Sequence, residues 1–104
     1  MIHVQIQITR IVDYGQPWFV ECELVDAFGR KWIFLEKEPV VNTADSLNEA
    51  DLPSPGVIAG HIVDEETDSA GRRIITIDTE KPWGIEAVTG ERRFDVLPEQ
   101  IVVQ

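Results

Sequence analysis

The stretch Ile2-His-Val-Gln-Ile-Gln-Ile8 decides the fold class, because every second residue in it is aliphatic. Side chains two residues apart lie on the same face of a β-strand, so the aliphatic and the polar side chains would take opposite faces. The alternation slips after Thr9, and a β-bulge near Thr9-Arg10 would absorb the slip. The segment therefore predicts a half-buried β-strand.

The same period of two recurs along most of the chain. Further strands are predicted at residues 18–24, 30–36, 57–63, 73–79, 84–88, 92–96 and 101–103, separated by turns with glycine or proline. Only residues 42–56 break the pattern, and Thr43 would cap at most one short helix within residues 43–51. We therefore expect one all-β domain over residues 1–104, a single small antiparallel barrel of seven or eight short strands.

One predicted hairpin determines where the rare residue Trp83 lies. A two-residue turn at Thr89-Gly90 would place Trp83 opposite Val96, on the same face as Ile85, Ala87 and Phe94. Glu86 would then pair with Arg93 on the other face. This register predicts a buried Trp83, and alternation likewise places Trp18 and Trp32 inside.

Composition excludes several classes of protein. The net charge of −10 comes from 19 acidic and 9 basic residues, and a field of that sign repels nucleic acids and anionic membranes. The longest apolar run, Trp32 to Leu35, is far too short to span a bilayer, and the start of the chain has no charged leader followed by an apolar block. The single cysteine, Cys22, cannot form an internal disulfide, so we expect a cytoplasmic location.

Motifs for chemistry are scarce. The chain has no glycine-rich phosphate loop and no zinc-ligand spacing, and the acidic run that begins at Asp64 lacks the glycine and glutamate of a calcium loop. Cys22 alternates with Val20 and Leu24, so it is interpreted as a small buried hydrophobic residue. We expect no cofactor, no metal ion and no catalytic group of a recognisable arrangement.

The C-terminal stretch Arg93-Phe-Asp-Val-Leu-Pro-Glu-Gln-Ile-Val-Val103 resembles the end of Src-homology-three-like (SH3-like) barrels, where a strand leads through a proline-opened helical turn into a short last strand. The resemblance implies a small barrel; an OB-like barrel is the alternative. Ile101 stands where that family carries a tyrosine for binding proline-rich peptides. The chain as a whole also looks like small acidic bacterial β-proteins, some of which are immunity partners of basic toxins.

The leading hypothesis for function is a non-catalytic, acidic accessory domain that binds a basic protein, as an immunity-type partner would. Opposite charge would speed association and make it sensitive to salt. The candidate binding residues are Glu21, Glu23, Glu36, Glu38, Asp64, Glu65, Glu66 and Asp68.

Two alternatives remain open. Arginines that follow turn glycines, Arg92 and Arg93 among them, would allow a small-molecule or anion-binding barrel. His61 would be the base of a small enzyme if a carboxylate lay within hydrogen-bond reach. Exposed edge strands would equally allow a homodimer.

Overall fold

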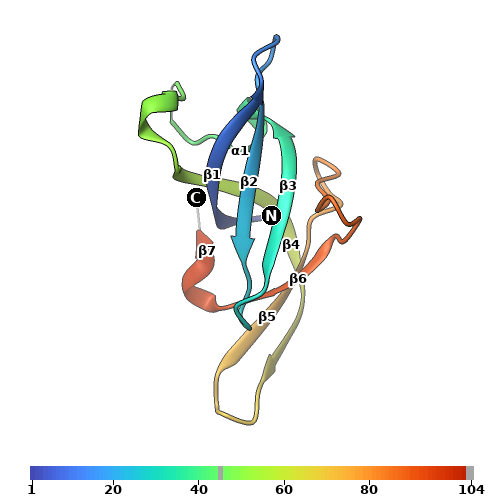
Figure 1. Ribbon diagram of the computed structural model, residues 1–104. Helices are drawn as coiled ribbons and strands as arrows, with labels where there is room; N and C mark the ends of the chain where they lie inside the picture. The colour runs from blue at the N-terminus through green and yellow to red at the C-terminus, as the bar shows by residue number, and fades with distance from the viewer. Residues whose placement is uncertain (45, 103–104) are drawn as a thin grey trace.

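The structure, a computed structural model, describes residues 1–44 and 46–102 and has an all-β fold (Figure 1). Its antiparallel sheet is strongly curled into a half-barrel with the strand order β3-β2-β1-β4-β5-β6, and β7 pairs with β1. This confirms the predicted fold class. The strands are β1 (Ile2–Asp13), β2 (Phe19–Val25), β3 (Lys31–Lys37), β4 (Ser54–Thr67), β5 (Arg73–Asp78), β6 (Arg93–Val96) and β7 (Ile101–Val102).

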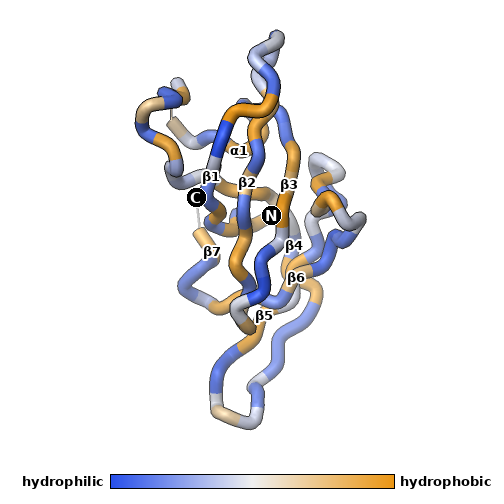
Figure 2. The backbone as a smooth tube through the Cα atoms, in the orientation of Figure 1, coloured by the Kyte–Doolittle hydropathy of each residue, from blue (hydrophilic) through white to orange (hydrophobic). Residues whose placement is uncertain are grey.

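The core follows from the alternation in the sequence (Figure 2). Val4 and Ile8 of β1 are fully buried, and Ile11 is buried after a register shift between Ile8 and Arg10 in the pairing with β2. The predicted bulge is therefore confirmed at its predicted place. On β2 the residues that alternate with glutamates, including Cys22, are fully or almost fully buried.

Strand β4 belongs to both halves of the curled sheet. Its first half, Ser54 to Gly60, pairs with β1, and its second half, from His61 onward, pairs with β5. The bend between them brings Gly60 so close to β5 that an added Cβ would lie 2.6 Å from the carbonyl oxygen of Asp78. Glycine at this position is therefore required by the close approach of two backbones.

The outer part of β4 also corrects a prediction. Residues 64–67 were assigned to a loop, but β4 continues through Thr67, which pairs with Arg73. Arg73 forms a 2.9 Å ion pair across the two strands with Glu65, so the acidic run is part of a projecting hairpin. The turn of this hairpin and the β1–β2 turn lie at opposite ends of the molecule, whose extents are 45 × 27 × 25 Å (Figure 1).

Aromatic side chains join β3 and β6, which are the two ends of the strand order. The Phe94 ring lies 5.3 Å from the Trp32 ring and 5.4 Å from the Phe34 ring, both in edge-on geometry. Two backbone hydrogen bonds add to this contact: Ala27 N to Asp95 O at 2.8 Å and Val88 N to Ile33 O at 2.8 Å.

The C-terminal segment matches its prediction. After β6, Pro98–Gln100 form a 3-10 turn, and β7 follows and pairs with His3 and Val4 of β1. The Gln100 side chain accepts a hydrogen bond from Leu97 N at 2.9 Å and donates one to Val25 O at 2.7 Å. The Gln100 side chain thus fastens the 3-10 turn to the end of β2, and β7 then pairs with β1.

The hairpin predicted for residues 84–96 is wrong, and so is the buried position of Trp83. Strand β6 pairs with β5 instead, with Phe94 opposite Ile77, and Trp83 is 62% exposed. Thr79, which is fully buried, bonds to both Ile85 and Arg92 and so closes residues 80–91 into a loop of their own. Ile85 and Ala87 point inward as expected, whereas Trp83 and Val88 face the solvent.

The helix expected within residues 43–51 is also misplaced. The short helix α1 spans Glu38–Val41, where Pro39 suits the first turn, and only Glu49–Asp51 form a 3-10 turn (η1), capped by the Asn48 side chain on Ala50 N at 3.0 Å. No helix covers residues 44 and 46–48, and position 45 of the predicted segment lies outside the described residues.

We predict that two aromatic-to-alanine substitutions will separate strongly in stability. Phe94→Ala removes the ring between β3 and β6 and should lower the free energy of unfolding by about 3–5 kcal/mol. Trp83→Ala, at an exposed loop tip, should change it by about 0.5 kcal/mol or less. Urea denaturation followed by circular dichroism measures both, and equal losses would contradict the loop described here.

We further predict that Gly60→Ala will destabilise the protein by about 1–3 kcal/mol, because its methyl group would overlap the Asp78 carbonyl. Gly15→Ala is the control, since its Cβ would meet only the movable Asp13 carboxylate, at 3.2 Å. Thermal unfolding of the two variants should show a clear drop in Tm for Gly60→Ala alone.

Candidate functional site

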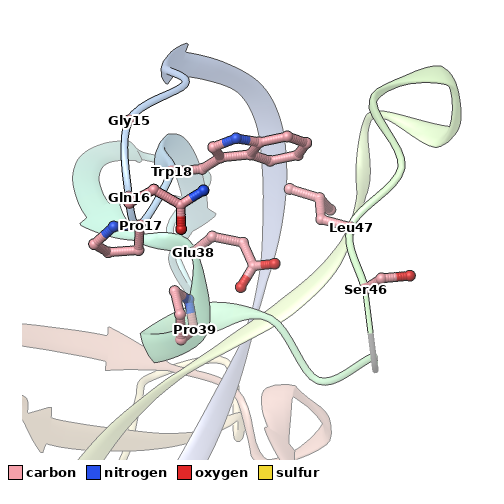
Figure 3. A pocket seen from close by; sticks show the side chains of 8 residues that line it. All are labelled: Gly15, Gln16, Pro17, Trp18, Glu38, Pro39, Ser46 and Leu47. Carbon is pink, nitrogen blue, oxygen red and sulfur yellow. The ribbon is translucent and has the colours of Figure 1, made fainter.

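A cleft of about 350 Å³ opens beside the β1–β2 turn, at one end of the half-barrel (Figure 3). The Trp18 indole forms one wall, Leu47 lies beside it, and the Glu38 carboxylate points into the space below the indole (Figure 3). Apart from Glu38 the walls carry no charge. The lining residues are Gly15, Gln16, Pro17, Trp18, Glu38, Pro39, Ser46 and Leu47.

The β2–β3 hairpin places Trp18 and Glu38 opposite each other. Phe19 pairs with Lys37 at the end of the two strands. Trp18 and Glu38 are the next residues outward and continue the pairing, since Glu38 N donates a 2.8 Å hydrogen bond to Trp18 O. Opposite residues on antiparallel strands share a face. The indole and the carboxylate therefore stand on the same face as the buried Val20, at the mouth of the half-barrel.

Tyr14 links this cleft to the segment that carries η1. Its ring meets the Trp18 ring edge-on at 5.6 Å between centroids, and its hydroxyl donates a hydrogen bond to the Glu49 carboxylate. That hydrogen bond raises the pKa of Tyr14 above its usual value, because it is made by the neutral phenol and the partner is negative. Tyr14 thus connects the Trp18 indole to Glu49.

Carboxylates without an ion-pair partner gather around the cleft. Glu38 accepts only a 3.4 Å hydrogen bond from Asn42, and Glu49 accepts from Tyr14. Asp51 lines an adjoining cleft of about 210 Å³ that shares Ser46 and Leu47 with the first. Within the described residues none of these acids has a basic side chain within 4.0 Å, and no basic residue lines either cleft.

The other predicted acidic residues do not join this group. Glu21 and Glu23, on the outer face of β2, are paired with Arg10 at 3.2 Å and Lys31 at 3.1 Å. Glu36 is half-buried near the mouth, and burial raises its pKa. The predicted acidic residues therefore lie in three places: at the cleft and its mouth, on the outer face of β2, and on the β4–β5 hairpin.

The third of these places is the β4–β5 hairpin. Glu65 is paired with Arg73, and Asp68 is paired with Arg72 at 2.9 Å; backbone hydrogen bonds from Arg72 and Ala70 help to lower the pKa of Asp68. Asp64 and Glu66 are exposed and carry no ion pair with a described residue.

The turn arginines are held in local ion pairs. Arg92 contacts Glu80 at 3.4 Å and Glu86 at 3.2 Å, while Arg93 contacts Asp78 at 3.0 Å. The predicted pair between Glu86 and Arg93 is therefore wrong, because β6 pairs with β5 and brings Arg93 opposite Asp78. Neither arginine lines the small cleft that lies near them, between His61, Asp78 and Lys81.

His61 is exposed and lies opposite Asp78 in the β4–β5 ladder. Both line a cleft of about 190 Å³, but the Asp78 carboxylate accepts from Glu80 N at 2.9 Å and from Arg93 at 3.0 Å. The backbone bond and then the arginine lower the pKa of Asp78, so it stays an anion bound to Arg93. No side-chain hydrogen bond joins His61 to a carboxylate in the described part of the chain.

Metal-ligand groups and membrane-spanning helices were sought among the described residues. Over residues 1–44 and 46–102, no three His, Cys, Asp or Glu side chains are grouped to hold a metal. The same residues include no helix with the length and apolar character needed to cross a membrane.

The chain matches no protein-family model, no curated protein and no solved structure at a significant level.

The sequence prediction includes Glu38 and places Trp18 inside. In the structure Trp18 is half-buried and packs against the core, and its indole also forms a wall of the cleft beside Glu38, which was not predicted. The signal was present in the hairpin: once Val25 is known to face Lys31, counting outward along both strands brings Trp18 opposite Glu38. The strands predicted at residues 18–24 and 30–36 do not by themselves fix that register.

Cys22 provides a prediction about reactivity. It is fully buried, and burial, followed by the charges of Glu36 and Glu21, raises its pKa to about 12. Since the thiolate is the reactive form, a thiol reagent at pH 8 should modify Cys22 only as fast as the protein unfolds. Reaction with Ellman's reagent, with and without denaturant, measures this; rapid labelling of the folded protein would contradict the burial of the thiol.

Proposed function

We propose that the protein is a non-catalytic accessory domain that binds a basic protein partner through the acidic end of its half-barrel, beside the Trp18–Glu38 cleft. The observation that carries this proposal is the uneven neutralisation of charge. Six of the nine basic residues are engaged in ion pairs on β1, on β3 and around β5 and β6, whereas the carboxylates at the cleft have no such partner in the described residues.

Electrostatics give this arrangement a direction. A net charge of −10 draws in a cationic partner over about 8 Å of solution at physiological salt, and the carboxylates at the cleft add an attraction that no neighbouring basic side chain cancels. Paired carboxylates such as Glu21 and Glu23 contribute less, because each already faces a cation. The partner would therefore approach the cleft rather than the outer face of β2.

The proposal also includes a barrel type, an immunity-type role and a cytosolic location. The order β6, 3-10 turn, β7 supports an SH3-like barrel, and an immunity-type role for a basic toxin would use such an acidic face. A free, buried cysteine suits a reducing compartment, so we place the domain in the cytosol. The charge disfavours nucleic acid as the partner.

Binding of a fluorescein-labelled nona-arginine peptide tests this proposal. We expect anisotropy titrations at low salt to show saturable binding that weakens strongly toward about 0.5 M salt. The double variant Glu38→Lys/Asp51→Lys should lose about tenfold or more in affinity, because the acidic end is inverted. The control Asp64→Lys/Glu66→Lys changes the net charge equally and should lose less than about threefold.

Two results would contradict the proposal. No binding of nona-arginine by the wild type at low salt would remove the basic partner altogether. Equal losses in the two double variants would show that net charge alone governs binding and that the cleft end has no special part.

A further inference from the structure

The cleft combines three properties that a single ligand group would have to match. It has an aromatic wall in Trp18, aliphatic walls in Leu47 and two prolines, and one carboxylate, Glu38, that points inward (Figure 3). Its volume of about 350 Å³ is near the lower end for ligand pockets, roughly 300–1,000 Å³, and suits one side chain better than a folded element. A flat cation with apolar faces has this combination of properties.

We propose that the Trp18–Glu38 cleft receives one arginine side chain of the basic partner, with the guanidinium against the indole and its N–H groups on the Glu38 carboxylate. This inference rests on the proposed function, and it names the side chain that the partner must present.

Arginine fits this site better than lysine for physical reasons. A guanidinium is planar, is weakly hydrated, stacks on aromatic faces and offers two parallel N–H groups to a carboxylate. An ammonium is compact and strongly hydrated, so it would lose more solvation against Leu47, Pro17 and Pro39.

The protein already places a guanidinium over an indole, with a carboxylate beside the indole, at the other end of the same hairpin. The Arg30 guanidinium lies over the Trp32 ring at 4.9 Å, and the Trp32 indole N–H donates to the Asp26 carboxylate at 3.0 Å. Indole, carboxylate and guanidinium are all supplied by the chain there. At Trp18 the indole and the carboxylate are present, and no basic residue lines the cleft.

The receiving groups are also held in place in advance. Tyr14 packs edge-on against Trp18, the bond from Glu38 N to Trp18 O fixes the two residues side by side, and Asn42 contacts the Glu38 carboxylate at 3.4 Å. Groups that are fixed before binding lose less conformational entropy when the ligand arrives. Affinity for a single exposed side chain would still be weak, and other contacts of the partner would add to it.

Nuclear magnetic resonance of the three indole N–H groups tests the inference with a blocked arginine, N-acetyl-arginine N-methylamide. We expect its addition to shift the Trp18 signal saturably, while the exposed Trp83 and the internally paired Trp32 serve as controls in the same spectrum. Blocked citrulline, which has the same shape without the charge, should shift none of them. Blocked lysine should bind at least about threefold more weakly.

Glu38→Gln removes the charge with little change in shape and leaves Trp18 in place, so it avoids the unfolding that loss of the indole could cause. It should abolish the Trp18 shift and weaken nona-arginine binding by about tenfold. Glu66→Gln, on the β4–β5 hairpin, is the control and should do neither.

The outcomes separate the two proposals. A silent Trp18 signal, equal shifts at Trp18 and Trp83, equal binding of blocked lysine, or full nona-arginine binding by Glu38→Gln would each overturn the arginine site. Any of these results, combined with selective loss of nona-arginine binding in Glu38→Lys/Asp51→Lys, would leave the proposed function standing. Failure of the wild type to bind nona-arginine would overturn the proposed function itself.

Discussion

The contact of Phe94 with Trp32 and Phe34 holds the two ends of the strand order together. Without it β3 and β6 would be the free edges of an open sheet, and the fully buried Ile77 would lose its cover. The hydrogen bonds at Ala27 and Val88 follow from this contact, because they join backbones that the rings bring together. The same ring therefore closes the half-barrel along β3.

The two ends of the β2–β3 hairpin differ in which side chains occupy them. At the β2–β3 turn the chain fills its own space with Arg30 over Trp32 and with Arg72 bonded to Ala27 O at 3.0 Å. At the opposite end of the hairpin, Trp18 and Glu38 continue past the last buried pair, and no basic side chain of the chain lines the space between them. The two ends of this hairpin therefore differ: the turn holds guanidinium groups of the chain itself, whereas the open end has a carboxylate without one.

Much of the fold could be predicted from the sequence, and the failures have a common cause. Period-two alternation located β1, its bulge and the inward side of β2, because burial on one face fixes those residues directly. It could not choose a partner for β6: Ile85, Ala87, Phe94 and Val96 are buried whether that strand pairs with residues 84–88 or with β5. The exposure of Trp83 and the contact between Trp18 and Glu38 depend on strand register and loop length, which the alternation of apolar and polar residues does not determine.

The shared strand β4 has a consequence for how the molecule comes apart. Because one continuous strand is hydrogen-bonded to β1 along its first half and to β5 along its second, the two halves have no linker between them. A cut in the exposed turn at residues 69–71 would leave β4 whole and both of its ladders intact. A cut beside Gly60 would leave the two halves held together by noncovalent contacts alone, among them the pairing of β7 with β1 and the packing of Phe94 on Trp32. The bend in β4 is therefore where a nick would remove the covalent link between the two ladders.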